Sequence, residues 1–93
     1  MSDTIRALEA VIAERRDHPR EGSYTCKLFA EGQVEILKKV GEEAIEVIIA
    51  ASLQDRERVV YESADLLYHL LVALAAKGIA WQDVEAELAQ RSR

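Results

Sequence analysis

Two long segments with helical apolar spacing leave this chain few possible folds, because a single short turn joins them. The first segment runs from about residue 33 to residue 51, and the second from about residue 56 to residue 77. The turn between them spans residues 52–55. Since a short connection between long helices makes them antiparallel neighbours, the sequence predicts a helical hairpin.

Three shorter segments complete an all-α prediction. Ile and Leu residues at helical spacing predict a first helix over residues 3–16, with Ser2 or Asp3 as its N-cap. Either Ser23 or Thr25 is expected to cap a short helix that runs through about residue 31, where Gly32 ends it. These helices and the hairpin predict a helical bundle.

The last predicted helix spans residues 81–91. Trp81, Val84 and Leu88 recur at helical spacing and are expected to form its inner stripe. Ala80 stands at the expected N-cap, where a side chain that accepts a hydrogen bond is favoured. We therefore expect the start of this helix to fray.

The second half of the longer hairpin helix predicts a homodimer. Residues 66–74 are apolar nearly all round the helix, which is typical of a helix buried on several sides. A chain of 93 residues buries a modest fraction of its surface and has too little protein to cover such a helix alone. We expect two copies to pair their hairpins into a four-helix core.

Length, charge and cysteine content predict a single soluble cytoplasmic domain over residues 1–93. The net charge of −5 argues against nucleic acid and anionic membranes as partners, since both require a basic face. The single cysteine, Cys26, fits a reducing compartment. The longest apolar run, 66–76, is interrupted by His69 and is too short to span a bilayer. The charged amphipathic start does not resemble a signal peptide.

Four carboxylates occupy matching positions on the two hairpin helices. Glu43 and Glu46 share one helix face, as do Glu62 and Asp65. Residues equally distant from Gln54 in the sequence lie at the same height in an antiparallel hairpin. Glu46 is therefore expected to face Glu62, and Glu43 to face Asp65, across packed helices roughly 8–10 Å apart.

An exposed, solvated helix face is the ordinary explanation for glutamates at helical spacing. Two features favour a site. Like charges three or four residues apart cost an isolated helix roughly 0.2–0.5 kcal/mol each. In addition, Glu62 and Asp65 open the most apolar helix of the chain, where a carboxylate cluster requires a counter-ion or a proton.

Oxygen-only ligands indicate Mg²⁺ or Mn²⁺ rather than zinc or iron. Mg²⁺ bound to few carboxylates completes its shell with waters and substrate phosphates. The chemistry expected is metal-assisted hydrolysis of a phosphoanhydride. The cation neutralises phosphate charge and lowers the pKa of a bound water, and a carboxylate takes the proton.

Nearby basic residues fit a phosphate-containing substrate. Lys39 lies one turn before Glu43 on the same side of the helix, Lys38 is adjacent, and Lys27 follows the loop. Each of these lysines is equally compatible with an ordinary surface position. His69 lies on the face of Asp65, where it could bind phosphate, orient a carboxylate, or serve as a core histidine with satisfied hydrogen bonds.

Two features keep alternatives open. The polar loop 17–24, with the only proline of the chain, is either a plain connector or a ligand-binding loop. Gly41 lies inside a predicted helix, where glycine costs roughly 1 kcal/mol against alanine. It marks either tolerated strain or the close approach of another backbone or a ligand.

The acidic residues resemble a known signature. Glu42-Glu43-x-x-Glu46 followed by Glu62-x-x-Asp65 is similar to the motif of the all-α, MazG-like nucleoside triphosphate pyrophosphatases. The stretches 23–28, 37–44 and 62–71 closely resemble the phosphoribosyl-ATP pyrophosphatase family. The resemblance covers nearly the whole chain.

This resemblance implies hydrolysis of 1-(5-phosphoribosyl)-ATP to phosphoribosyl-AMP and pyrophosphate, the second step of histidine biosynthesis, with Mg²⁺ in the cytoplasm. It implies metal ligands at Glu42, Glu43, Glu46, Glu62 and Asp65, the last four of which we also take as catalytic. It implies substrate contacts from Ser23, Thr25, Lys27 and Lys39, to which we add His69.

The family domain is often fused to phosphoribosyl-AMP cyclohydrolase, and we expect this chain to be the stand-alone form with a functional link to that enzyme. Two rival functions keep the same fold. One is a housecleaning pyrophosphatase acting on noncanonical nucleotides. The other is a non-catalytic dimeric helical module whose acidic face binds a partner.

Overall fold

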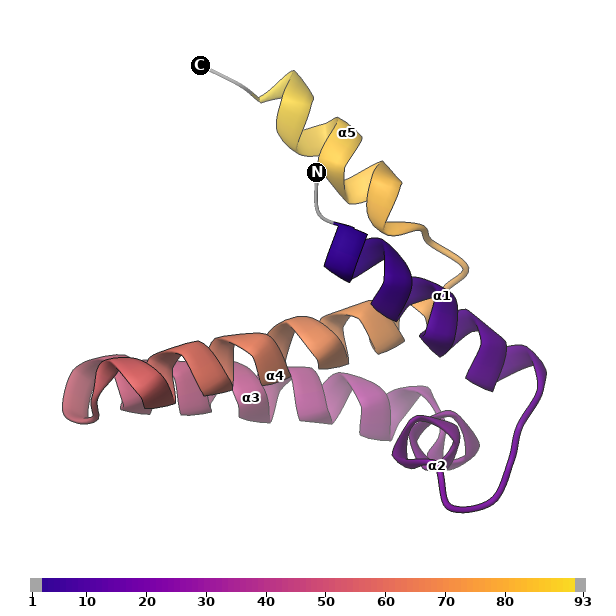
Figure 1. Cartoon of the computed structure of the whole chain (residues 1–93), viewed down its shortest axis with the longest axis horizontal. Coiled ribbons are helices and arrows are strands. Elements are labelled where there is room, and N and C mark those ends of the chain that lie inside the picture. The colour runs from indigo at the N-terminus through magenta and orange to yellow at the C-terminus, as the bar shows by residue number, and fades with distance from the viewer. Residues whose placement is uncertain (1–2, 92–93) are drawn as a thin grey trace.

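The computed structural model describes residues 3–91 as five helices, with no β-strand among them. The helices are α1 (Asp3–Asp17), α2 (Tyr24–Glu31), α3 (Gln33–Leu53), α4 (Arg56–Ala76) and α5 (Trp81–Gln90). In Figure 1, α3 and α4 form a long hairpin, α1 and α2 lie at its open end, and α5 projects away from it. The all-α prediction is confirmed, and each predicted helix exists within two residues of its expected bounds. Ser2, one of the two expected caps of α1, lies outside the described residues.

The hairpin turn is tighter than predicted. Helix α3 continues through Leu53, so Gln54 and Asp55 alone link it to α4. Both linking residues have extended backbone angles, and the Asp55 side chain accepts a hydrogen bond of 3.0 Å from the Arg58 backbone N–H. Because this carboxylate satisfies a free N–H of the first turn, the predicted Asp55 cap is confirmed.

Two glycines end their helices. Gly78 has a φ of +73°, and the pair of backbone bonds at this end is that of a Schellman motif. Its members are Ile79 N–H to Leu74 O at 2.9 Å and Gly78 N–H to Ala75 O at 3.0 Å. Gly32, with a φ of +98°, separates α2 from α3. Other residues rarely adopt these angles, so both glycines fix sharp changes of chain direction.

The hydrophobic core lies where α1 and α2 cover the open end of the hairpin. Its fully buried side chains include Ile12 of α1, Leu28 of α2, and Leu71 and Val72 of α4. Burying a side chain of this size contributes about 1.5–3 kcal/mol. These contacts therefore hold α2 in a fixed position against the hairpin.

Helix α4 is the central helix of this core. Its buried residues are Glu62, His69, Leu71, Val72, Ala73 and Ala75. Within residues 3–91 it alone has the length and hydropathy that a membrane crossing would require, and the core helix of a soluble protein passes the same test. This signal is therefore weak evidence for a membrane span.

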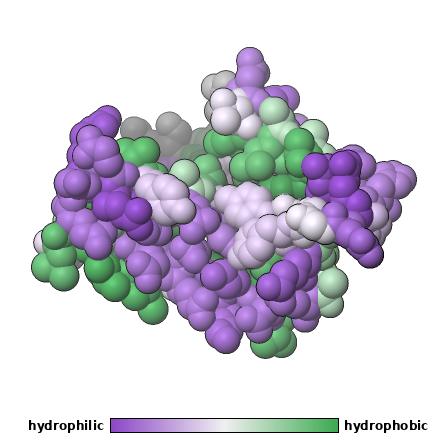
Figure 2. Space-filling view, turned by 60° about the horizontal axis from the view of Figure 1, so that its bottom comes forward, coloured by the Kyte–Doolittle hydropathy of each residue, from purple (hydrophilic) through white to green (hydrophobic). Residues whose placement is uncertain are grey.

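The turn end of the hairpin exposes apolar side chains. Ile48 of α3 is 63% exposed, and several apolar neighbours along the two helices are exposed as well. They are Ile45, Ile49, Leu53, Val60 and Tyr61. Figure 2 shows hydrophobic surface along the lower left, on the side where Figure 1 places the hairpin turn. A single chain leaves this end uncovered, and dimerisation stays a prediction.

Helix α5 is attached through its first turn. The Trp81 N–H donates a hydrogen bond of 2.7 Å to the Glu9 carboxylate of α1, and the Ala80 N–H donates to Asp83 at 3.2 Å. Ala80 makes no side-chain cap, as expected, and Glu9 of α1 instead accepts the hydrogen bond from the Trp81 backbone N–H. Fraying of this start stays a prediction. Within Trp81–Gln90 no residue is buried, and Leu88 is exposed, so the expected inner stripe is covered only in part.

Candidate active site

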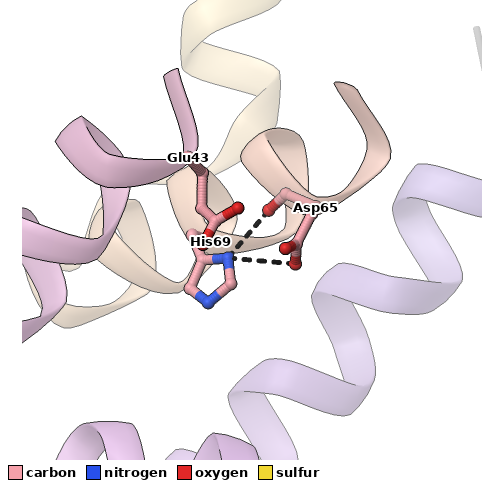
Figure 3. A group of neighbouring side chains, drawn as sticks. All are labelled: Glu43, Asp65 and His69. Atoms are coloured by element: carbon pink, nitrogen blue, oxygen red, sulfur yellow. Dashed lines mark hydrogen bonds and ion pairs between the residues drawn. The ribbon is translucent and has the colours of Figure 1, made fainter. Parts of the chain in front are cut away.

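Glu43 of α3 meets Asp65 and His69 of α4 in the interior of the hairpin (Figure 3). One potential ligand atom from each of the three side chains lies within 4.8 Å of the others. Glu43 is 7% exposed, His69 is 3% exposed, and Asp65 is half-buried. The prediction that Glu43 faces Asp65 at the same height is confirmed.

The Asp65 carboxyl of this cluster has a perturbed pKa. The pKa of Asp65 is raised, first because burial disfavours its charged form and then by the hydrogen bond and negative charge of Glu43. The charge of Glu62 raises it further, whereas His69 opposes the shift. Asp65 therefore holds a proton, or accepts a cation as a neighbour, more readily than a separate surface carboxylate does.

Lys39 lies beside the cluster. Its Nζ atom is 3.4 Å from Glu43 Oε2 and 3.6 Å from Glu42 Oε1. Partial burial lowers the lysine pKa, but Tyr24 and the two glutamates outweigh burial, so the pKa of Lys39 is raised. The prediction that Lys39 shares a side with Glu43 is confirmed, and the site carries a fixed positive charge.

The remaining predicted ligands, Glu42, Glu46 and Glu62, are not members of this three-residue cluster. Glu62 is 5% exposed, and its Oε2 atom is 2.5 Å from the Arg58 guanidinium. Glu46 is exposed on α3, and Glu42 pairs with Lys39 at the surface. The structure therefore brings together the predicted pair of Glu43 and Asp65. The pairing of Glu46 with Glu62 and the metal roles of these three glutamates stay predictions.

Sequence reasoning missed Arg58 and Tyr24. Arg58 stands four residues before Glu62, and this i,i+4 spacing of opposite charges is a signal that could have found it. Tyr24 lies between the predicted contact residues Ser23 and Thr25 but was not itself predicted. Its hydroxyl lies 2.9 Å from His69 Nε2. No local spacing predicts that contact, which joins residues 45 positions apart.

The predicted substrate contacts of α2 divide into inward and outward side chains. Thr25 is buried, and its hydroxyl pairs with that of Tyr68. The Ser23 Oγ atom caps α2 by accepting a 3.1 Å hydrogen bond from the Cys26 N–H. Lys27 is exposed, 4.0 Å from Glu31. Their substrate contacts stay predictions.

An open cavity of about 410 Å³ lies beside the start of α2. It is lined by Pro19, Arg20, Glu21, Gly22, Ser23, Cys26, Lys27 and Ala30. Arginine, lysine and a serine hydroxyl suit an anionic group. Ser23 and Lys27 thus border a space that a ligand can enter, whereas Thr25 does not.

Buried carboxylates on a helical hairpin, with a lysine at the rim, define the class of the all-α nucleoside triphosphate pyrophosphatases. A model of the family described as Phosphoribosyl-ATP pyrophosphohydrolase matches residues 5–92. The chain belongs to this family, and it is a hydrolase.

The names of individual relatives agree with this family assignment. A phosphoribosyl-ATP pyrophosphatase of Metallosphaera sedula is 47% identical over 93 residues, the whole of both chains. One of Pelotomaculum thermopropionicum is 55% identical over 89 residues, which cover 96% of this chain and 91% of that protein. The histidine biosynthesis bifunctional protein HisIE of Pyrococcus furiosus is 52% identical over 89 residues, 41% of its length.

Proposed function

We propose that this protein hydrolyses 1-(5-phosphoribosyl)-ATP to 1-(5-phosphoribosyl)-AMP and pyrophosphate, the second step of histidine biosynthesis, in a Mg²⁺-dependent reaction. Family membership supports the substrate. The observation that carries the chemistry is the buried cluster of Glu43 and Asp65 with Lys39 at its edge. A triphosphate requires cations, and a hydrolytic water requires a base, and this cluster offers both.

The residues present fit Mg²⁺, with Mn²⁺ as a substitute. Glu43 and Asp65 present carboxylate oxygens at one place, and the raised pKa of Asp65 reflects burial and negative charge that a divalent cation would compensate. Glu42, Glu46 and Glu62 are the further ligands that we propose. When bound, the cation withdraws charge from the phosphate oxygens as the anhydride bond breaks.

The side chains supply the remaining steps. Lys39, whose Nζ atom is 3.4 Å from Glu43 Oε2, would exchange this ion pair for one with an entering phosphate. Water attacks phosphorus, a new P–O bond forms, and the bond to the leaving phosphate oxygen breaks. A carboxylate of the cluster accepts the proton of the attacking water. Ser23, Thr25, Lys27 and His69 are proposed to contact the substrate.

A homodimer is part of the proposal. The apolar residues exposed at the turn end include Ile48, Ile49 and Leu53. A contiguous apolar surface of this kind is typical of a protein–protein interface. Pairing two hairpins there would bury these side chains and complete a four-helix core.

We also propose a cytoplasmic location and a functional link to phosphoribosyl-AMP cyclohydrolase, which would consume the product. A relative whose name describes a bifunctional protein of histidine biosynthesis supports this link. Nucleic acid and membranes are not proposed as partners, given the net charge of −5.

Pyrophosphate release from phosphoribosyl-ATP, measured with Mg²⁺ and after its removal by a chelator, tests the proposal. We expect turnover that requires the metal. A parallel panel of noncanonical nucleoside triphosphates tests the housecleaning alternative, which predicts faster turnover of those substrates. A folded sample that hydrolyses none of them, and binds no Mg²⁺ in calorimetry with nucleotide present, contradicts an enzymatic role for the site.

A further inference from the structure

The buried carboxylates among residues 3–91 are Glu43 and Glu62, and each has a basic residue one helical turn before it. Glu43 of α3 is 7% exposed and pairs with Lys39, and Glu62 of α4 is 5% exposed and pairs with Arg58. In both pairs the partners stand four positions apart, so they share one helix face. Each hairpin helix therefore supplies a cation to the acidic residue that it buries.

The two partners of the Arg58–Glu62 pair differ in burial. Nη2 of Arg58 lies 2.5 Å from Oε2 of Glu62. A buried carboxylate without a partner is strongly unfavourable, so Glu62 requires a cation. The Arg58 side chain is 49% exposed, and water can therefore solvate its guanidinium when the pair breaks. Glu62 thus needs a positive partner, but that partner need not be Arg58.

Arg58 has a second contact that does not involve Glu62. Its guanidinium carbon lies 4.7 Å from the centre of the Tyr61 ring, which is the geometry of a cation–π contact. Arg58 also stands in the first turn of α4, where the positive end of the helix disfavours a cation. Tyr61 can therefore keep the guanidinium near Glu62 after their ion pair breaks.

Glu62 contributes to the charge of the cluster of Glu43, Asp65 and His69. It stands three residues before Asp65 on the same helix face, and its negative charge raises the pKa of Asp65. The charge of Glu62 therefore favours a cation at the cluster, and Arg58 competes for the same charge.

We propose that Arg58 is a placeholder cation, which neutralises Glu62 in the metal-free protein and turns to a phosphate of the substrate when Glu62 binds Mg²⁺. The inference rests on the proposed function for the metal and the phosphate. An arginine presents two parallel N–H donors, which match two phosphate oxygens as well as they match a carboxylate. The exchange keeps the charges paired before and after binding. It also holds the metal affinity down until a phosphate is present to receive Arg58.

Metal binding by the substrate-free protein tests the exchange. Mn²⁺ prefers the same oxygen ligands as Mg²⁺, and electron paramagnetic resonance follows its free concentration during a titration. Arg58→Gln removes the competing cation. We expect the Mn²⁺ dissociation constant to fall about 3- to 10-fold, because a partly exposed ion pair no longer has to be broken. An unchanged or higher dissociation constant overturns the proposal, since a purely structural ion pair does not compete with the metal.

Arg56→Gln is the matched control. Arg56 is exposed in the same first turn of α4, and its replacement changes the net charge equally while the Arg58–Glu62 pair stays in place. It should change the Mn²⁺ dissociation constant by less than about 2-fold, because water and salt screen an exposed charge. Equal effects of the two glutamine variants would indicate a general change of the electrostatic field and reject the specific role of Arg58.

Arg58→Lys separates the positive charge from the paired N–H donors. Lysine keeps a cation near Glu62 but presents only a point charge to a phosphate. We expect a Mn²⁺ dissociation constant within about 2-fold of wild type and, at saturating Mg²⁺, a KM for phosphoribosyl-ATP raised about 10-fold. Arg58→Gln should raise KM at least as much, and Arg56→Gln should not. A wild-type KM in both Arg58 variants rejects the phosphate contact and overturns the proposal.

The two measurements also separate this inference from the proposed function. Circular dichroism should show intact helices in all variants, and if Arg58→Gln does not fold, the KM of Arg58→Lys decides. A wild type that binds Mn²⁺ but does not hydrolyse phosphoribosyl-ATP would reject the proposed substrate, while the titrations would still decide whether Arg58 competes at Glu62. Absence of Mn²⁺ binding in both wild type and Arg58→Gln would overturn the inference.

Discussion

The two ends of the α3–α4 hairpin differ in what covers them. At the open end, α1 and α2 cover an apolar core, and the cluster of Glu43, Asp65 and His69 lies near the middle of both hairpin helices. At the turn end, Ile48 and Leu53 project from the surface. The middle of the hairpin thus buries a carboxylate while the turn end exposes apolar groups, the reverse of the usual arrangement.

This reversal indicates which kind of partner each region of the hairpin is suited to bind. Buried carboxylates are unfavourable alone and become favourable when a cation binds between them. Exposed isoleucines are unfavourable alone and become favourable when another apolar surface covers them. The cluster in the middle of the hairpin is therefore suited to a small charged ligand and the turn end to a protein partner, which we take to be a second copy.

Removing a cluster carboxylate should have the largest effect. Glu43→Ala or Asp65→Ala should lower the rate of pyrophosphate release by more than about 100-fold, since a ligand matters more than the outer contacts that orient it. Circular dichroism should show the helices intact. Glu46→Ala, at an exposed position of the same helix, tests whether the second predicted pair takes part. Full activity in both cluster variants would contradict the assignment.

A charge at the turn end should break the dimer. Ile48→Asp places a carboxylate twice in a symmetric interface, where each isoleucine contributes about 1.5–3 kcal/mol. We expect the dimer dissociation constant to rise by at least about 100-fold in analytical ultracentrifugation. Val34→Asp, also exposed but at the other end of α3, is the matched control. A wild-type monomer, or equal effects of both changes, would reject the turn end as the interface.

Neutralising Asp65 should stabilise the metal-free protein at neutral pH. Its pKa is raised in the folded state, so the folded chain binds this proton more tightly than the unfolded chain does. The free energy of unfolding contributed by Asp65 is full below about pH 3.9, the ordinary aspartate pKa, and is lost as pH rises through the raised value.

Asp65→Asn removes this loss. In chemical denaturation at neutral pH it should exceed wild type by roughly 0.5–1 kcal/mol, a modest figure because the group is partly solvated. Added Mg²⁺ should narrow the gap by stabilising wild type. A variant less stable than wild type in metal-free buffer would mean that the contact with His69 outweighs the repulsion by Glu43.

Gly41→Ala should have the smallest effect on activity, and it tests whether a ligand or a second subunit approaches the interior of α3. A Cβ atom built there meets nothing within 4 Å, so the close approach of another backbone of the same chain is not observed. Alanine should raise the free energy of unfolding by roughly 1 kcal/mol. Unchanged activity and dimerisation would identify the glycine as tolerated strain, whereas loss of either would show that a ligand or second subunit approaches it closely.

The sequence by itself determined the helices, their ends, and the opposition of Glu43 and Asp65. These follow from local geometry, since an α-helix rises about 1.5 Å per residue and capping residues act within one turn. Two residues that are equally distant from the turn in the sequence therefore lie opposite each other, at the same level of the antiparallel hairpin.

Only the tertiary structure decided how each helix is rotated and which neighbour covers it. This packing brings the Tyr24 hydroxyl to His69 and the Glu9 carboxylate to the backbone N–H at the start of α5. The two contacts join residues 45 and 72 positions apart. They also left Glu46 exposed while burying Glu62 against Arg58. The physical reason is that such contacts depend on the packing of the whole core, which no local spacing encodes.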